Sequence, residues 1–298
     1  MRSESEEKTL VVLAAGLGSR FGGDKQINGV GPNGEFLLEY SVYDALRAGF
    51  DRFVIVVNAA VEQHVLERLL PIVGKDRLFL VVQPLPTLRV KPWGTGHAVL
   101  SVRDYVHGPF MVVNGDDFYG RVAFEQAAIT IDSGQINVQH YGMIAYPLKN
   151  TLSENGPVSR GVCMIDVENK LIHLEEQTGI QRQENGEITS SDTSIEIHEN
   201  TSVSMNCWMF NPSVFQLLEG EFNHFLEVNR EHNSAEFYLP SAIQTALSAN
   251  KVAVQVHPTT SHWCGLTYAQ DRSEVQNFLM ELTKQGIYPN QLSAWLRS

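Results

Sequence analysis

The chain has 298 residues, which is enough for one large α/β domain with additions, and no low-complexity linker divides it. Its 34 acidic and 22 basic residues give a formal charge of −12, which would repel nucleic acid and anionic membranes. The polar first residues and the lack of a long apolar run argue against a signal peptide and a membrane span, so we expect a cytoplasmic protein. Three scattered cysteines predict buried thiols rather than disulfides or a zinc site.

The first predicted element is a buried strand that runs into a glycine-rich loop, with the sequence LVVLAAGLGSRFGGDK over residues 10–25. The glycines of this loop lack a Cβ, so that backbone N–H groups can surround an anion. Arg20 can hold two phosphate oxygens with its planar guanidinium, and Lys25 can follow a phosphate as a mobile point charge. The stretch therefore predicts a nucleotide site.

Two common phosphate-binding loops do not match this stretch. A dinucleotide-binding turn has the pattern G-x-G-x-x-G and an acid after the next strand, but here Phe21 takes the third small position and the next strand ends in Val57-Asn58. A Walker loop needs Gly-Lys followed by Ser or Thr, which is absent from this stretch. Both classes of nucleotide site are therefore disfavoured.

Apolar strands alternate with amphipathic helices in the first half of the chain. Apolar residues at helical spacing predict a helix over 35–48, and a second over 61–70 that closes at Pro71. Buried strands are predicted over 10–14, 53–57, 78–82 and 110–114. Such alternation is typical of a parallel sheet covered by helices on both faces, with ligands at the carboxyl ends of its strands.

The second half of the chain has a different pattern. A polar run over 181–200 predicts a surface excursion. The other expected elements are strands over 141–146, 161–166, 171–174, 203–210 and 252–256, a helix that starts over 212–218, and helices over 236–247 and 273–285.

Two predicted strand ends carry side chains that can bind a metal ion or a nucleobase. Asp116 and Asp117 follow the strand over 110–114, and their hard carboxylate oxygens suit Mg²⁺ bound together with substrate phosphates. Gln83 ends another strand, and its amide can both donate and accept a hydrogen bond, so it can recognise the imide edge of a pyrimidine. Gly94 would let backbone groups reach the same base.

Three motifs together resemble the nucleotidyltransferases that join a nucleoside triphosphate to a sugar 1-phosphate: the loop over 10–25, a strand-end Gln followed by Gly-Thr-x-His-Ala, and Asn-Gly-Asp-Asp over 114–117. The resemblance implies a three-layer, Rossmann-like α/β fold, related to the A fold of glycosyltransferases, with a predominantly parallel mixed sheet. It implies Mg²⁺ as cofactor and uracil as the preferred base. The residues it assigns to the nucleotide are Leu13, Ala14, Ala15, Gly16, Gly18, Ser19, Gln83, Gly94 and Thr95, and the catalytic ones are Arg20, Lys25 and Asp116.

The acceptor site is less well matched. Family members carry Glu-Lys-Pro after a strand, where this chain has Glu176-Gln177, so Glu176 is expected to bind the acceptor and the lysine that meets its phosphate is missing. Arg160 and Lys149 are candidates to replace that lysine. The residues assigned to the acceptor are Gly142, Glu176 and Asn206, and those assigned to the metal are Asp116, Asp117 and Asp271.

We therefore expect one catalytic domain over 1–298, with a nucleotide-binding half over 9–135, an acceptor-binding half over 136–270 and a C-terminal helix over 271–298. It would transfer a nucleoside monophosphate from UTP to a sugar 1-phosphate, with nucleoside triphosphate and acceptor as its partners and neither nucleic acid nor membrane. A non-sugar acceptor such as choline phosphate, a glycosyltransferase and a regulatory protein that binds nucleotide sugar remain alternatives. Whether the chain forms a homo-oligomer is left open.

Overall fold

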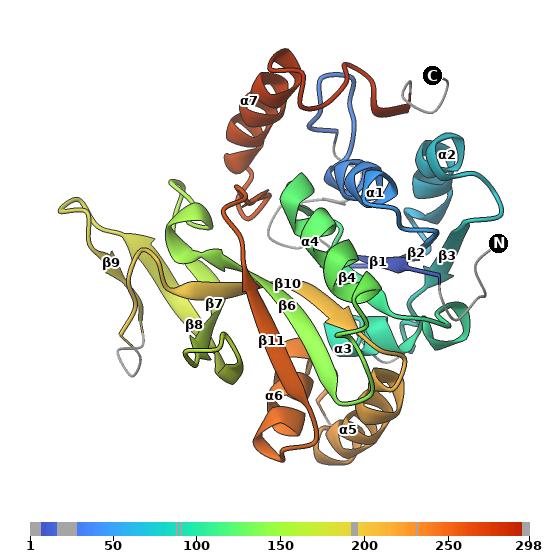
Figure 1. Ribbon diagram of the computed structural model, residues 1–298, viewed down its shortest axis with the longest axis vertical. Helices are drawn as coiled ribbons and strands as arrows, with labels where there is room; N and C mark the ends of the chain where they lie inside the picture. Colours follow the sequence, from blue (N-terminus) through green and yellow to red (C-terminus); the bar gives the residue numbers. More distant parts are fainter. Residues whose placement is uncertain are drawn as a thin grey trace.

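The centre of the protein is a mixed β-sheet with helices on both faces (Figure 1). This computed structural model describes residues 7–16, 29–87, 89, 91–191, 196–230 and 232–293. The predicted three-layer α/β fold is confirmed. Four residues assigned to the phosphate loop, Gly18, Ser19, Arg20 and Lys25, lie outside the described residues, so their roles stay predictions.

The sheet has the strand order β3-β2-β1-β4-β10-β7-β8-β9, and β6 pairs with β10 and β11. Its first four strands are parallel, β10 runs antiparallel to β4, and β11 runs parallel to β6. The strands are β1 Thr9–Ala14, β2 Arg52–Val57, β3 Leu78–Val82, β4 Phe110–Asn114, β6 His140–Pro147, β7 Val158–Ile165, β8 Leu171–Arg182, β9 Ile188–Thr189, β10 Ser202–Phe210 and β11 Ala253–Pro258. A separate two-stranded ladder joins β5 (Asp117–Phe118) to β12 (Cys264–Gly265).

Helices α1, α2 and α4 cover one face of the sheet, and α3, α5 and α6 cover the other (Figure 1). Helix α7 packs beside α1 and β5 in a third, smaller core. The helices are α1 Leu37–Arg47, α2 Glu62–Val73, α3 Thr95–Leu100, α4 Arg121–Asp132, α5 Val214–Val228, α6 Leu239–Ser248 and α7 Asp271–Lys284. Short 3₁₀ turns lie at Arg103–Tyr105 and Leu148–Asn150.

Side chains of the parallel strands point alternately to the two faces of the sheet, so a layer of helices packs on each face. In β1, Leu10 and Val12 pack under the α1 and α4 layer, whereas Val11 and Leu13 pack under the α3 and α5 layer. Successive side chains of a strand point to opposite faces, so an uninterrupted apolar strand must be buried on both. The carboxyl ends of β1 to β4 consequently lie at one edge of a covered sheet, where ligands can reach them.

Several predicted elements differ in extent. Pro71 does not close α2, which continues to Val73 and ends at Gly74 with φ +85°. A proline removes one backbone bond, and in the last helical turn the following residues still keep theirs. Strand β8 extends through the polar run to Arg182 and forms a hairpin with β9. Helix α7 ends at Lys284, because Gly286 takes a positive φ.

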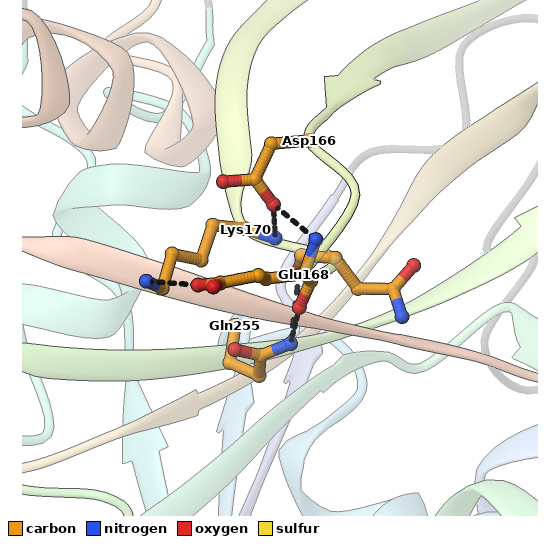
Figure 2. Close-up of polar contacts among 5 residues, drawn as sticks. Asp166, Glu168, Lys170 and Gln255 are labelled. Atoms are coloured by element: carbon orange, nitrogen blue, oxygen red, sulfur yellow. Dashed lines mark hydrogen bonds and ion pairs between the residues drawn. The ribbon is translucent and has the colours of Figure 1, made fainter.

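Hydrogen bonds within the loop and from β11 hold the tip of the β7–β8 hairpin in place (Figure 2). Asp166 Oδ1 accepts the backbone N–H groups of Glu168 and Lys170, both at 2.8 Å. From β11, Gln255 Nε2 donates to the carbonyl oxygens of Glu168 at 2.9 Å and Asn169 at 3.1 Å. This contact fixes the position of the hairpin relative to the central strands.

The segment that follows α7 contacts α1 through a buried carboxyl group. Tyr288 donates a hydrogen bond of 2.6 Å to Asp44 Oδ2, and within the part of the chain that the structure describes Asp44 Oδ1 is buried without a hydrogen-bond partner. Because burial disfavours the charged form, the pKa of Asp44 is raised to about 7.

We expect Asp44→Asn to flatten the pH dependence of stability. The folded pKa of Asp44 exceeds the value near 4 of an unfolded Asp, so the folded state holds the extra proton between about pH 4 and 7 and loses stability as the pH rises through this range. The slope for one group is at most about 1.4 kcal/mol per pH unit. The amide is uncharged and keeps an oxygen for Tyr288. Urea unfolding from pH 5 to 8 should show the variant gaining stability over wild type as the pH rises, and parallel curves would contradict this.

Candidate active site

A cavity of about 240 Å³ opens beyond the carboxyl end of β4. Its lining residues come from β4 and β5 on one side and from β7, β8 and β10 on the other, with Pro240 and the segment around β12 closing it. The lining residues are Asn114, Asp116, Asp117, Ser159, Arg160, Gly161, Glu176, Ser204, Met205, Asn206, Pro240, Trp263, Leu266 and Thr267. Four residues assigned from the sequence, Asp116, Asp117, Glu176 and Asn206, therefore share one cavity.

The two acids stand at the end of β4 in different environments. Asp116 is partly exposed, whereas Asp117 is 7% exposed and accepts a hydrogen bond of 2.9 Å from Asn114 Nδ2. Burial, and secondarily the charge of Asp116, raises the pKa of Asp117. Gly115 serves close approach here rather than a positive φ, since a Cβ there would lie 2.8 Å from the Cβ of Ala14.

Gly265 leaves room for the Asp117 carboxylate. The two residues face each other in the β5–β12 ladder, and a Cβ at 265 would lie 2.6 Å from Asp117 Oδ1. A side chain at this position would therefore have to displace the carboxylate or the adjacent Trp263 ring, whose Cζ2 is 2.7 Å away. Strand β12 therefore contacts Asp117 through Gly265.

Two carboxylates with unequal exposure fit a divalent cation that binds together with substrate. Hard cations of this kind take one or two carboxylates and complete their shell with water and substrate phosphates. The described residues contain no group of three or more His, Cys, Asp or Glu side chains that could hold a metal without substrate. The donor set of Asp116 and Asp117, beside the gap left by Gly265, agrees with the first arrangement.

The opposite wall of the cavity carries Glu176 and Asn206. Glu176 pairs with Gly161 across the β7–β8 ladder, where a Cβ would lie 3.1 Å from Leu174 Cδ1 and 3.4 Å from Ser204 Cβ, so the glycine allows close packing beside the cavity. Asn206 has φ +57° in the part of β10 where its register with β6 shifts. Asn tolerates this left-handed conformation better than most residues, and the irregularity places it in the cavity lining.

Arg160 is the buried cation of the cavity. It is 7% exposed, donates to the carbonyl oxygens of Thr151 and Ser159, and lies over the Trp263 ring at 4.9 Å. Burial lowers its pKa to about 10, which still leaves the guanidinium charged at neutral pH. Gln177, opposite Arg160 in the ladder, is fully buried, and its amide has no hydrogen-bond partner among the described residues.

The nucleotide-assigned residues that the structure describes lie along the same edge of the sheet. Leu13, Ala14 and Ala15 bury their side chains in the two cores, so their contribution to a ligand would come from the backbone; Gly16 follows them directly. Gln83 directly follows β3 and contacts Gly94 and His97. Thr95 Oγ1 accepts the backbone N–H of Leu239 at 3.0 Å, which ties α6 to α3.

Two assigned residues lie elsewhere. Gly142 pairs with Met209 near the start of β6, where a Cβ would lie 2.7 Å from Met209 Cε; it belongs to the core because strand-end ligands meet the other end of β6. Asp271, the first residue of α7, lines a neighbouring cavity and accepts hydrogen bonds from Ser153, Asn155 and the Tyr268 backbone, so its assignment to the metal stays a prediction.

Sequence reasoning did not assign Ser159, Gly161, Ser204 or Thr267 to the site. The available signal was the Arg-Gly pair at 160–161 inside an otherwise apolar strand. An arginine there needs a special environment, and the following glycine allows close approach. No residue in the described part of the chain belongs to a helix long and apolar enough to cross a membrane.

Comparisons with known proteins agree with this arrangement. Residues 10–116 match the family described as a MobA-like NTP transferase domain. Two relatives are each named bifunctional protein GlmU. The one from Methanococcus maripaludis is 29% identical over 165 residues, 53% of this chain and 32% of that protein. The one from Methanocaldococcus jannaschii is 27% identical over 126 residues, 42% of this chain and 23% of that protein. The match thus spans a third or less of either relative.

Two solved structures share the fold across most of the chain. An inositol-1-phosphate CTP transferase from T. maritima has a TM-score of 0.65 at 16% identity, covering 94% of this chain and 97% of that one. A putative glucose-1-phosphate thymidylyltransferase from Bacillus anthracis has a TM-score of 0.62 at 13% identity, covering 91% and 95%. The two structures show that the chain has the fold of these nucleotidyltransferases, and the family match covers its residues 10–116.

Proposed function

We propose that this protein transfers a nucleoside monophosphate, with UTP as the favoured donor, to a small phosphorylated polyol such as a sugar 1-phosphate, and releases pyrophosphate. The observation that carries the proposal is the cavity in which Asp116 and Asp117 face Glu176 and Asn206. The two aspartates can bind phosphates through a cation. Glu176 and Asn206 can form hydrogen bonds with hydroxyl groups.

In the proposed reaction, an oxygen of the acceptor phosphate attacks the α-phosphorus of the triphosphate, and the bond to the bridging oxygen of the β-phosphate breaks. That bridging oxygen leaves with the pyrophosphate. Asp116 and Asp117 would hold Mg²⁺, which neutralises the charge of the phosphates when bound. Positioning and charge neutralisation suffice, because an ionised phosphate needs no base to remove a proton.

The cavity lining favours a polyol over choline as the acceptor. Ser159, Glu176, Ser204, Asn206 and Thr267 offer hydroxyl, amide and carboxylate groups. Recognition of a quaternary ammonium group uses several aromatic faces, and Trp263 is the one aromatic residue in the lining given by the described residues. Two solved structures of the same fold are named for polyol phosphates, inositol 1-phosphate and glucose 1-phosphate.

The proposal is tested by measuring pyrophosphate release with Mg²⁺ across the four ribonucleoside triphosphates and dTTP. The acceptor panel holds sugar 1-phosphates, inositol 1-phosphate, choline phosphate and glycerol 3-phosphate. We expect release that requires one triphosphate and one polyol phosphate together. If no pair of substrates releases pyrophosphate and the protein still binds nucleotide sugar, a glycosyltransferase or a regulatory protein would be favoured instead.

We expect Glu176→Gln to raise the KM for the acceptor about 10-fold, because a charged hydrogen-bond acceptor for substrate hydroxyls is lost. The KM for the triphosphate should stay within twofold. Glu175→Gln is the matched control: adjacent residues of β8 point to opposite faces, and Glu175 lies 3.5 Å from His173 instead of lining the cavity. Equal effects of the two substitutions on the KM for the acceptor would show that Glu176 does not bind it.

A further inference from the structure

Strand β5 presents its two residues to different surroundings. Asp117 lines the cavity, whereas Phe118 is 3% exposed and packs in the third, smaller core. Successive side chains of a strand point to opposite sides, so the Phe118 ring lies on the side of β5 away from the Asp117 carboxylate. Because the two residues share a peptide bond, the contacts that hold the ring also hold the acid.

Aromatic rings from distant parts of the chain hold Phe118. The centroid of its ring lies 6.0 Å from that of Tyr40 in α1, 5.5 Å from that of Phe278 in α7 and 5.9 Å from that of Tyr288. All of these pairs meet edge to face, the arrangement that the charge distribution of aromatic rings favours. Tyr288 also meets Tyr40 edge to face at 5.1 Å, so the rings support one another.

Tyr288 is itself fixed to the helices that cover the sheet. It is 2% exposed, and its hydroxyl donates the 2.6 Å hydrogen bond to Asp44 in α1. The carbonyl oxygen of the preceding residue, Ile287, accepts a hydrogen bond of 2.6 Å from Arg121 at the start of α4. The Tyr288 ring therefore connects this layer of helices to Phe118.

We propose that Tyr288 is a positioning residue for the cation site, which acts on Asp117 through the ring of Phe118. In this role it keeps the Asp117 carboxylate where it can share a Mg²⁺ with Asp116. The inference rests on the proposed function, in which the two acids hold that cation together. Tyr288 lies outside the cavity lining, so its effect on the reaction is indirect. The segment that follows α7 is then part of the support of the active site.

Two substitutions in the full-length protein separate the ring of Tyr288 from its hydroxyl. Tyr288→Leu removes the ring, and Tyr288→Phe keeps it. The measurement is the Mg²⁺ concentration that gives half the maximal rate of pyrophosphate release, with the substrate pair that the panel identifies. We expect this concentration to rise about 10-fold in Tyr288→Leu, the lower end of the range for residues that support metal ligands, and to stay within about twofold of wild type in Tyr288→Phe.

Hydrogen exchange tests the same support without any substrate. In Tyr288→Leu, the amides of residues 114–120 and 262–268 should exchange faster than in wild type, whereas those of β1 and β2 should keep their rates. Phe278→Leu removes another ring from Phe118 and should have the same effects, and it decides the question if Tyr288→Leu does not fold.

Leu218→Ala is the control for a general loss of stability. Leu218 is fully buried in α5, in the core on the other face of the sheet. Its substitution should lower the melting temperature and leave both the Mg²⁺ requirement and the exchange of residues 114–120 unchanged. If Leu218→Ala raised the Mg²⁺ requirement as much as Tyr288→Leu, Tyr288 would be structural and the positioning role would be wrong.

Two further outcomes distinguish the inference from the proposed function. Unchanged exchange in Tyr288→Leu, or faster exchange with an unchanged Mg²⁺ requirement, would overturn the inference and leave nucleotidyl transfer possible. Absence of pyrophosphate release by the wild-type protein with every substrate pair would overturn the proposed function, and the positioning role with it.

Discussion

Replacing Asp116 with alanine should lower the rate of pyrophosphate release by about 10²- to 10³-fold, the loss typical for one preorganised charge at a reacting centre. Asp116 ends the turn after β4 and is the more exposed of the two acids in the cavity. Its loss would leave Asp117, whose carboxylate is buried and already hydrogen-bonded to Asn114, to hold the cation alone. Because Asp116 is partly exposed, the folded protein should tolerate the substitution.

The measurement is kcat and KM for both substrates, together with the melting temperature. Asp104→Ala is the matched control, since Asp104 is an exposed acid in the 3₁₀ turn Arg103–Tyr105. A variant at 116 that turns over as fast as the control would exclude a catalytic role. A large fall in melting temperature would instead assign the residue to the fold.

Gly265→Ala should cost both stability and activity. Its Cβ would lie 2.6 Å from Asp117 Oδ1, closer than such atoms approach in real structures, so Asp117 or Trp263 must move. Overpacking of this kind typically costs about 1–3 kcal/mol. Moving Asp117 also disturbs the cation site, so we expect at least a 10-fold loss of turnover.

Gly220→Ala is the control for this substitution. Gly220 lies within α5, and apart from its chain neighbours and the nearby backbone of its own helix, no described atom is within 4 Å of the place where its Cβ would be. Alanine in a helix interior is favoured over glycine by up to about 1 kcal/mol, so this variant should be as stable as wild type or more so. Wild-type stability and turnover in Gly265→Ala would show that the ladder between β5 and β12 can widen. Glycine would then not be required at position 265.

The parallel half of the fold could be predicted because burial on both faces leaves a plain signal. Runs such as Phe53-Val54-Ile55-Val56-Val57 are apolar at every position, and each became a strand near its expected bounds. Short or polar elements left weaker signals. Helix α3 has six residues, and β8 buries Leu174, Gln177 and Ile180 at a spacing of three, which is not the alternation expected of a strand.

The candidate site divides in the same way. Asp116, Asp117 and Gln83 follow strands directly, so the strand-end rule located them. Gly142 lies outside the lining of the cavity, and its place along β6 depends on a pairing with β10 that the sequence does not show. Asp271 also lies outside that lining, and its partners, Ser153 and Asn155, are over a hundred residues away in sequence.

Strand β10 has a consequence for how the protein unfolds. Trp208–Phe210 pair with β4, whereas Val203 and Ser204 pair with β7, so one strand completes the sheet on the nucleotide side and on the acceptor side. The Tyr119 hydroxyl, 2.7 Å from the Met205 carbonyl oxygen, joins the same two regions. A chain cut near residue 135 would separate β4 from β10 and leave each piece with an unpaired strand edge. We therefore expect the two halves to unfold together as one cooperative unit, and neither half to fold when it is separated from the other.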